Sequence, residues 1–504
     1  MSSGGWISEE EDADLRAIVV ALERAQYAYA ADLYDLNRTL QRDAAASLLR
    51  AEVALNQDDA ARALAILLKL RAEKRELEVR RNILLGAAYT HNFQYDVADE
   101  HFEAARAAAG SDRDLAAQTA YRQGRRFVAT DQPELARQFL QAARDGSSKR
   151  SQLEALQLES HVLEAEENYR DQARILMLLL EQIDLLQNEF VDIAAYGVWA
   201  LSALACELFL PGAVELCELH LQAEWPPDLR IQRFQAFKSV AWAKALSGDY
   251  FNAFRYLRRS EQNAPTKTWH VIALLDRACV ARCVKEQRWS RQDLAEAEDL
   301  AERVDWRTAA KEERVALLLL AELLAPIDPA RASHYFTLYQ EILESAPPAH
   351  SSKNPRARAL VAYVEGVVHS ACGHSRAASS AFERALNTYE KIQYAWRAGR
   401  CALRLYELTH ENRFKDLAQT RLQYYASSCL ADELRETIKR ESRVHLPPMQ
   451  RRVLEEIQAG HDTAEIARRL GRSSHTVKNH IKMIFKAYKV SSRPALLAAV
   501  AREQ

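Results

Sequence analysis

The sequence predicts an all-α protein, and three observations favour this class. Glycine (14 residues) and proline (13 residues) each make up under 3 % of the 504 residues, against about 7 % and 5 % in average proteins. A chain rich in strands and turns needs more of both. Alanine, leucine, arginine and glutamate, which favour helices, are abundant. Helix-forming segments separated by short polar turns also recur along most of the chain.

The overall composition is that of an ordinary globular protein, with 48 % hydrophobic and 27 % charged residues. This excludes a fully disordered chain, a collagen and a disulfide scaffold. Apolar runs such as 315–321 and 175–180 are far shorter than the roughly 18 residues that span a bilayer. The acidic residues 1–14 lack the apolar core of a secretion signal and are expected to form a flexible tail. We therefore expect a cytoplasmic protein with no membrane partner.

One pattern of small and large residues recurs within residues 15–430, the expected bounds of the first domain. It occurs three times with the same internal spacing, at Gly86, Ala98, Phe102 and Ala105, at Gly124, Ala136, Leu140 and Ala143, and at Gly366, Ala378, Phe382 and Ala385. The small residues let two antiparallel helices approach closely, and the large residue is expected to fill the groove to the next pair. Because one helical hairpin cannot bury its apolar face alone, the pattern predicts hairpins stacked into a superhelix.

Residues 85–105 fit the pattern L-G-x-x-Y…A-x-x-x-F-x-x-A at every position, which resembles the tetratricopeptide repeat family. The resemblance covers roughly residues 40–430, where the other copies fit in part. The period exceeds the family's value of about 34 residues, so slightly longer helices or turns are expected. The resemblance implies a surface that binds a protein, peptide or small effector. A mainly structural or dimerising role is the other interpretation, and fold alone does not decide between them.

The chain ends in a short basic segment. Residues 445–504 hold 11 Lys and Arg against 5 Asp and Glu, a net charge of +6, while the rest of the chain holds 57 basic and 65 acidic residues. This asymmetry favours an anionic partner for the end alone. Residues 431–444, rich in charges, are predicted to be either a linker or a last helix of the repeats. The two prolines at 447 and 448 can open a helix, and a further helix is expected at about 493–501.

Between these two helices the sequence predicts a helix-turn-helix at about residues 463–482. Asp462 or Thr463 can cap its first helix, and Gly471 can end it in a left-handed conformation. Only one residue then precedes Ser473, which can cap the next helix. The turn is therefore as short as helix-turn-helix motifs require.

The helix that follows Ser473 has two contrasting faces. Val477, Ile481 and Ile484 recur at helical spacing and are expected to pack inward. The opposite face carries Lys478, Asn479, Lys482, Lys486 and Lys489. Such a face suits the major groove of DNA, although scattered lysines alone more often form a solvated surface.

This segment resembles the LuxR-type, or GerE-like, DNA-binding domain. The residues that carry the resemblance are Gly460, Glu465-Ile466-Ala467, Leu470, Thr476-Val477-Lys478-Asn479-His480, Phe485, Val490 and Arg493. The resemblance implies that Lys478, Asn479 and Lys482 face base edges, and that Thr476, His480 and Lys486 lie toward phosphates. We place Arg472, Lys489 and Arg493 near the DNA backbone from their charge alone. The usual Thr-x-Arg-Glu start is replaced by Pro447-Pro448-Met449-Gln450, which puts the cap of the first helix in doubt.

No motif indicates catalysis, a cofactor or a metal. Phosphate-binding loops of the G-x-x-x-x-G-K-[ST] and G-x-G-x-x-G types are absent from the sequence. Cys279 and Cys283 could supply half of a zinc site, but two cysteines that pack between repeats are the better interpretation. His475 and His480 are spaced by five residues, which does not place both on one helix face. We expect a protein that is not an enzyme.

These observations together predict a transcription regulator. Its C-terminal domain would read double-stranded DNA as a homodimer, and its repeats would bind an unknown protein, peptide or small-molecule effector. The acidic body could hold the free protein in a state that binds DNA weakly. The alternative is an interaction scaffold, with a helix-turn-helix that docks protein instead of DNA.

Overall fold

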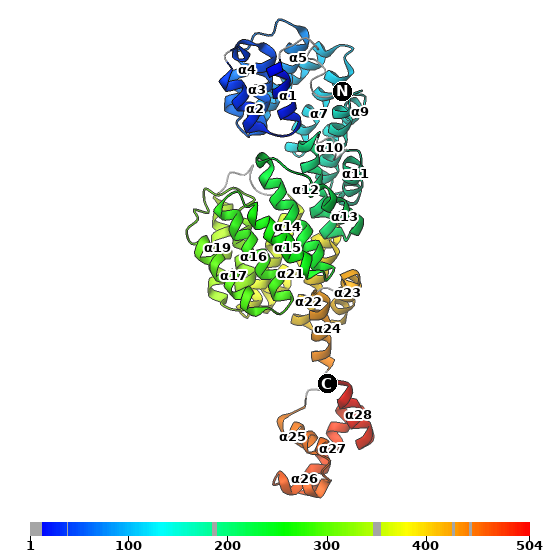
Figure 1. Ribbon diagram of the computed structural model, residues 1–504. Coiled ribbons are helices and arrows are strands. Elements are labelled where there is room, and N and C mark those ends of the chain that lie inside the picture. Colours follow the sequence, from blue (N-terminus) through cyan, green and yellow to red (C-terminus); the bar gives the residue numbers. More distant parts are fainter. Residues whose placement is uncertain are drawn as a thin grey trace. The chain divides into compact units, whose positions relative to one another are not determined.

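The computed structural model describes residues 13–37, 39–183, 189–345, 354–425, 429–442 and 446–503. Every regular element in these ranges is a helix, which confirms the all-α class (Figure 1). The chain divides into two compact units, residues 1–429 and 430–504, and each is described here by itself. The tail expected at residues 1–14 falls almost wholly outside the described residues, because the first helix begins at Ala13.

The first unit is a series of antiparallel helix pairs, each with a first and a second helix, preceded by α1 (Ala13–Glu23) and α2 (Tyr27–Leu36). The first helices are α3 (Ala44–Asn56), α5 (Arg75–His91), α7 (Arg113–Ala129), α10 (Lys149–Ala165), α12 (Val191–Leu208), α14 (Arg230–Leu246), α16 (Lys267–Cys283), α18 (Val315–Leu324), α20 (Pro355–Ala371) and α22 (Ala395–Thr409). The second helices are α4 (Ala60–Leu67), α6 (Tyr95–Ala109), the broken pair α8 (Pro133–Gln138) and α9 (Leu140–Arg144), α11 (Tyr169–Glu181), α13 (Pro211–His220), α15 (Tyr250–Gln262), α17 (Gln287–Ala301), α19 (Pro329–Glu344), α21 (Ser375–Lys391) and α23 (Asn412–Leu422). Consecutive first helices from α3 to α20 contact one another, as the predicted tetratricopeptide-like superhelix requires.

Short 3-10 turns occur at η1 (Leu40–Arg42), η2 (Pro227–Leu229) and η4 (Gln423–Tyr425). The second unit contains α24 (Cys429–Ser442), α25 (Pro448–Gln458), α26 (Thr463–Arg469), α27 (Ser474–Ala487) and α28 (Arg493–Glu503). The sequence predicted either a linker or a last helix at residues 431–444, and helix α24 covers most of this segment.

The turn inside most pairs has one recurring geometry. After α3, Asp58 adopts a left-handed conformation (φ 59°), and the next amide, of Asp59, donates to the carbonyl of Ala54. The same residue Asp59 then caps α4 through its side chain. Left-handed residues occupy the equivalent turns at Phe93, Asp131, Glu167, Gly248, Lys285 and Gly373. Only two of these left-handed positions are glycines. The chain can therefore make many tight turns although its glycine content is low.

The recurring glycines allow the close helix approach that the sequence predicts. A Cβ atom on Gly86 would lie 2.6 Å from Cε1 of Phe102, and one on Gly366 would lie 2.7 Å from the ring of Phe382. Both contacts are within a pair, so Phe102 packs on its own partner helix, whereas the sequence suggested that it fills the groove to the next pair. Gly124 differs, because its neighbour is Leu158 of the next pair.

We expect the substitution Gly86→Ala to destabilise the protein by about 1–2 kcal/mol. The added methyl group would collide with a fully buried ring, a cost of about 1–3 kcal/mol that the better helix propensity of alanine offsets only in part. Gly212→Ala is the matched control, since nothing lies within 4 Å of its Cβ position. Chemical denaturation of both variants tests the prediction, which fails if Gly86→Ala is as stable as the control.

Polar side chains link successive first helices in a regular ladder. The Tyr121 hydroxyl of α7 donates to Gln157 of α10 at 2.8 Å, and the indole N–H of Trp242 in α14 donates to Asp276 of α16 at 2.7 Å. The partners are separated by 36 and 34 residues, one repeat in each case. The first helices therefore present a polar face, which we call the first-helix face.

Repeats far apart in the sequence also contact one another. Arg397 of α22 forms an ion pair with Glu207 of α12 at 2.7 Å, across 190 residues. Arg400 pairs with Glu322 of α18, and the rings of Trp242 and Trp396 stack with their centroids 6.1 Å apart. Further ion pairs join Arg356 to Glu164 and Lys391 to Glu167. These closing contacts fix α20–α22 against the central repeats.

Helix α12 is long and apolar enough, by length and composition, to cross a membrane. In this structure 67 % of that segment is buried among the other helices of the first unit. It contacts α11, α13, α14 and α22. Its apolar character is therefore accounted for by packing, as in a core helix with neighbours on several sides.

Candidate nucleic-acid interface

Helices α25–α28 form a small bundle around one apolar core. Its buried members come from all four helices and include Val453, Ile466, Ile484 and Leu496, each fully buried. Helix α25 begins at Pro448, as the two prolines predicted, and no side chain caps it. The segment thus has a core of its own, which gives its recognition surface a rigid support.

The turn between α26 and α27 is set by local chemistry. Asp462 caps α26 by accepting from the amide of Glu465 at 2.8 Å, and this hydrogen bond holds the pKa of Asp462 below its ordinary value. Gly471 is left-handed (φ 62°), and the amide of Arg472 donates back to Ala467. Ser473 then caps α27 by accepting from the Thr476 amide at 3.1 Å. The two helices of the motif therefore span 463–469 and 474–487.

Helix α27 has the two faces that its sequence predicts. Val477, Ile481 and Ile484 are buried in the bundle. Lys478, Asn479 and Lys482 are exposed, and Lys486 is exposed one turn further along. The helix contains no acidic residue, and its lysines form no ion pair with any residue that the structure describes. The exposed face is therefore an uncompensated cationic surface, suited to an anionic partner.

The residues expected near phosphates occupy several different environments. Arg472 and Lys489 are exposed, and Lys489 is left-handed (φ 52°) just after α27. His480 is half-buried. The Thr476 hydroxyl lies 2.8 Å from Ser473 Oγ, so it belongs to the helix cap as well as to the surface.

Arg493 has structural partners inside the bundle. Its guanidinium donates to the carbonyl oxygen of His461 at 2.8 Å and to Thr463 Oγ1 at 3.2 Å. These two bonds tie the start of α28 to the start of α26. Any contact to DNA would use the donors that remain, so we interpret Arg493 first as a positioning residue.

Sequence reasoning missed one network at the end of α25. Glu456 pairs with His461 at 2.8 Å and with Arg469 at 2.9 Å. This network joins α25 to α26 and engages Arg469, which is still exposed, as are Arg468 and Arg472. The only signal in the sequence was the presence of Glu456, His461 and Arg469 on either side of the α25–α26 turn. Charged residues at similar spacing are common on solvated helices, so this signal is weak.

Comparison with known families identifies this bundle. The family model for GerE, described as bacterial regulatory proteins of the luxR family, matches residues 445–500. Residues 445–500 form a LuxR-type DNA-binding domain. The match covers the bundle from Leu446 to Val500 and includes the whole helix-turn-helix. The predicted resemblance of this segment is thereby confirmed.

Two solved structures are similar to the chain over most of its length. The apo form of RapI is 13 % identical, covers 79 % of this chain and 98 % of its own, and gives a TM-score of 0.40. The APC/C hetero-tetramer Cut9-Hcn1 is 15 % identical, covers 84 % and 89 %, and gives a TM-score of 0.35. These values describe a distant likeness. No curated protein sequence matches the chain.

Proposed function

We propose that the protein is a sequence-specific transcription regulator whose LuxR-type domain inserts α27 into the major groove of DNA. The observation that carries the proposal is the unpaired cationic face of α27 within a domain of that family. Lys478, Asn479 and Lys482 are proposed to face the bases. Thr476, His480, Lys486, Arg472 and Lys489 are proposed to lie toward the phosphates, which set register without reading sequence.

One recognition helix covers only a half-site, so we propose that the protein binds DNA as a homodimer. The two half-sites should then lie about one helical turn, roughly 34–36 Å, apart. The repeats are proposed to bind an effector that changes DNA affinity. The net charges of −8 on the body and +6 on residues 445–504 support weak DNA binding by the free protein.

Selection of bound DNA from a random pool tests this function. The full chain and residues 445–504 are compared at two salt concentrations. A shared motif with two half-sites supports a dimeric regulator, and a motif recovered by the short domain alone supports inhibition by the body. Binding without a motif that collapses as salt rises would indicate phosphate attraction only. The scaffold alternative would then be the better account.

A further inference from the structure

Two adjoining cavities open on the first-helix face of the N-terminal repeats. The larger, of about 200 Å³, is lined mostly by polar side chains of α7, α10, α12 and α14, with further residues from α2, α3 and η2, and we call it the chamber. The smaller, of about 60 Å³, is lined by the apolar side chains of Leu22, Leu48, Leu49, Ile83 and Leu84 together with polar ones that include Glu52, Arg80 and Gln118, and we call it the annex. The two cavities share Asn56, Arg122, Arg150 and Glu154, so a ligand can occupy both. Several water-sized groups fit in each.

The chamber contains arginine donors that the protein does not use. Arg125 donates to the Tyr121 hydroxyl at 3.3 Å and forms no ion pair with a carboxylate of the described residues. Arg122, one turn earlier on α7, has its nearest carboxylate, Glu52, at 3.8 Å. That separation is too long for a hydrogen bond. Two guanidinium groups on one helix thus have free donors toward the chamber, which favours a carboxylate or another planar anion.

The same chamber contains acceptors that lack donors. Arg150 already pairs with Glu154 at 3.1 Å and with Asp192 at 3.0 Å. The second oxygens of both carboxylates, Glu154 Oε2 and Asp192 Oδ1, are buried without a hydrogen bond, as is Gln232 Oε1. Buried acceptors are rarely left unsatisfied, because each costs about 1–3 kcal/mol. Asp192 and Gln232 therefore favour a ligand that donates several hydrogen bonds, such as an ammonium group.

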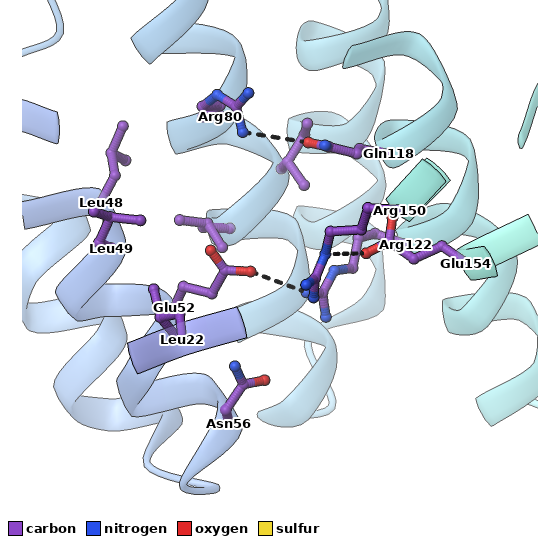
Figure 2. Close-up of a pocket in the computed structure, with 12 residues that line it drawn as sticks. Leu22, Leu48, Leu49, Glu52, Asn56, Arg80, Gln118, Arg122, Arg150 and Glu154 are labelled. Atoms are coloured by element: carbon purple, nitrogen blue, oxygen red, sulfur yellow. Dashed lines mark hydrogen bonds and ion pairs between the residues drawn. The ribbon is translucent and has the colours of Figure 1, made fainter. Parts of the chain in front are cut away.

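The annex adds an apolar subsite beside the arginines. Figure 2 shows Leu48 and Leu49 on one side of the cavity, with Arg122 and Arg150 on the opposite side. Glu52 lies between them, and the dashed line from Glu52 to Arg122 marks the long ion pair. An aliphatic group in the annex would be transferred from water to an apolar surface, which is favourable. The same ligand could still reach Arg122 in the adjoining chamber.

We propose that the chamber and annex bind a small zwitterion with an apolar side chain, either a free α-amino acid or a dipeptide. Its carboxylate contacts Arg122 and Arg125, its ammonium group contacts Asp192 and Gln232, and its side chain occupies the annex. A simple anion would leave the acceptors without donors, and a simple cation would leave the arginines without an acceptor. The inference deepens the proposed function, because it names the class of effector that the repeats bind.

Calorimetric titration of the full chain tests the proposal without DNA, so its outcome is independent of the DNA selection. The probes are L-leucine, L-leucyl-L-leucine, 4-methylpentanoate, 3-methylbutylamine and glycine. At least one of L-leucine and L-leucyl-L-leucine should bind. Tighter binding of L-leucine would indicate a free amino acid as the ligand, and tighter binding of L-leucyl-L-leucine would indicate a dipeptide. The three fragments, each of which lacks one group, should bind at least about tenfold more weakly.

Two variants and one control locate the site. Arg125→Met keeps the apolar stem of an exposed side chain and removes its guanidinium donors, and Gln232→Leu removes one acceptor. Each should weaken zwitterion binding by about tenfold or more, since charge-assisted hydrogen bonds are among the stronger ones. Arg174→Met, which removes an arginine that is 80 % exposed on α11, should leave binding unchanged.

Three results would overturn the proposal. The first is a wild-type chain that binds neither L-leucine nor L-leucyl-L-leucine. The second is binding of 4-methylpentanoate as tight as that of leucine, which would indicate an anion site. The third is equal binding by Arg125→Met, Gln232→Leu and the control, which would place the ligand elsewhere. Thermal unfolding of each variant shows that the chain is folded before titration.

Discussion

Replacing Lys478 and Lys482 by alanine should abolish recognition of the selected DNA motif while the protein stays folded. Both side chains are exposed and lie one turn apart on the cationic face of α27, so their removal leaves the bundle core intact. A good base contact contributes about 1–3 kcal/mol. The double variant should therefore lose about 2–6 kcal/mol of binding free energy, roughly 30-fold or more in affinity. Fluorescence anisotropy with the motif and with a scrambled sequence measures the loss.

The contrast between base and phosphate contacts makes this prediction specific. Asn479→Ala should relax the sequence preference at one position, whereas Lys486→Ala should weaken binding to all sequences alike and lower the salt dependence by about one phosphate contact. The matched control removes the exposed Lys69 and Lys267 from the repeats, which changes the net charge equally. If this control loses as much affinity as the α27 variant, the effect is one of overall charge and the assignment of α27 is wrong.

The repeat spacing could be predicted from sequence because its causes are local. Gly86 and Phe102 lie 16 residues apart in one hairpin, and close packing of two helices requires a residue without a side chain at that point. The helix-turn-helix could be predicted for the same reason, since Asp462, Gly471 and Ser473 act on backbone groups within a few residues of themselves.

The features that sequence could not predict depend on how curvature accumulates along the superhelix. Each pair adds a small rotation, so the meeting of α22 with α12 is decided by all the pairs between them. No spacing rule connects Glu207 to Arg397 across 190 residues. The chamber is of the same kind, because its lining comes from several successive repeats, from α2 to α14. The two hydrogen bonds of Arg493 within the bundle were not predicted either, because His461 and Thr463 lie 32 and 30 residues away in the sequence.

Glu207→Ala should be among the most destabilising single substitutions in the repeats, at about 3–5 kcal/mol. The side chains of Glu207 and Arg397 are only 13 % and 25 % exposed, and Arg397 also lies over the Trp396 ring at 4.6 Å. Burial alone would lower the pKa of Arg397, but Glu207 and Tyr389 raise it, so the guanidinium stays charged. Removal of Glu207 would leave that charge buried without its partner, which is the costly way to break such a pair.

The charge itself, and not the loss of packing, should account for most of this cost. We therefore expect the double substitution of Glu207→Leu with Arg397→Met to recover most of the lost stability, because an apolar pair of similar volume often replaces a buried ion pair at little cost. Asp299→Ala is the control: its pair with Arg303 is 59 % and 64 % exposed and should contribute less than about 1 kcal/mol. Urea unfolding of the four proteins decides the point. A double variant as unstable as Glu207→Ala would contradict the prediction, because it would show that the cost comes from the lost shape of these two side chains and not from an unpaired charge.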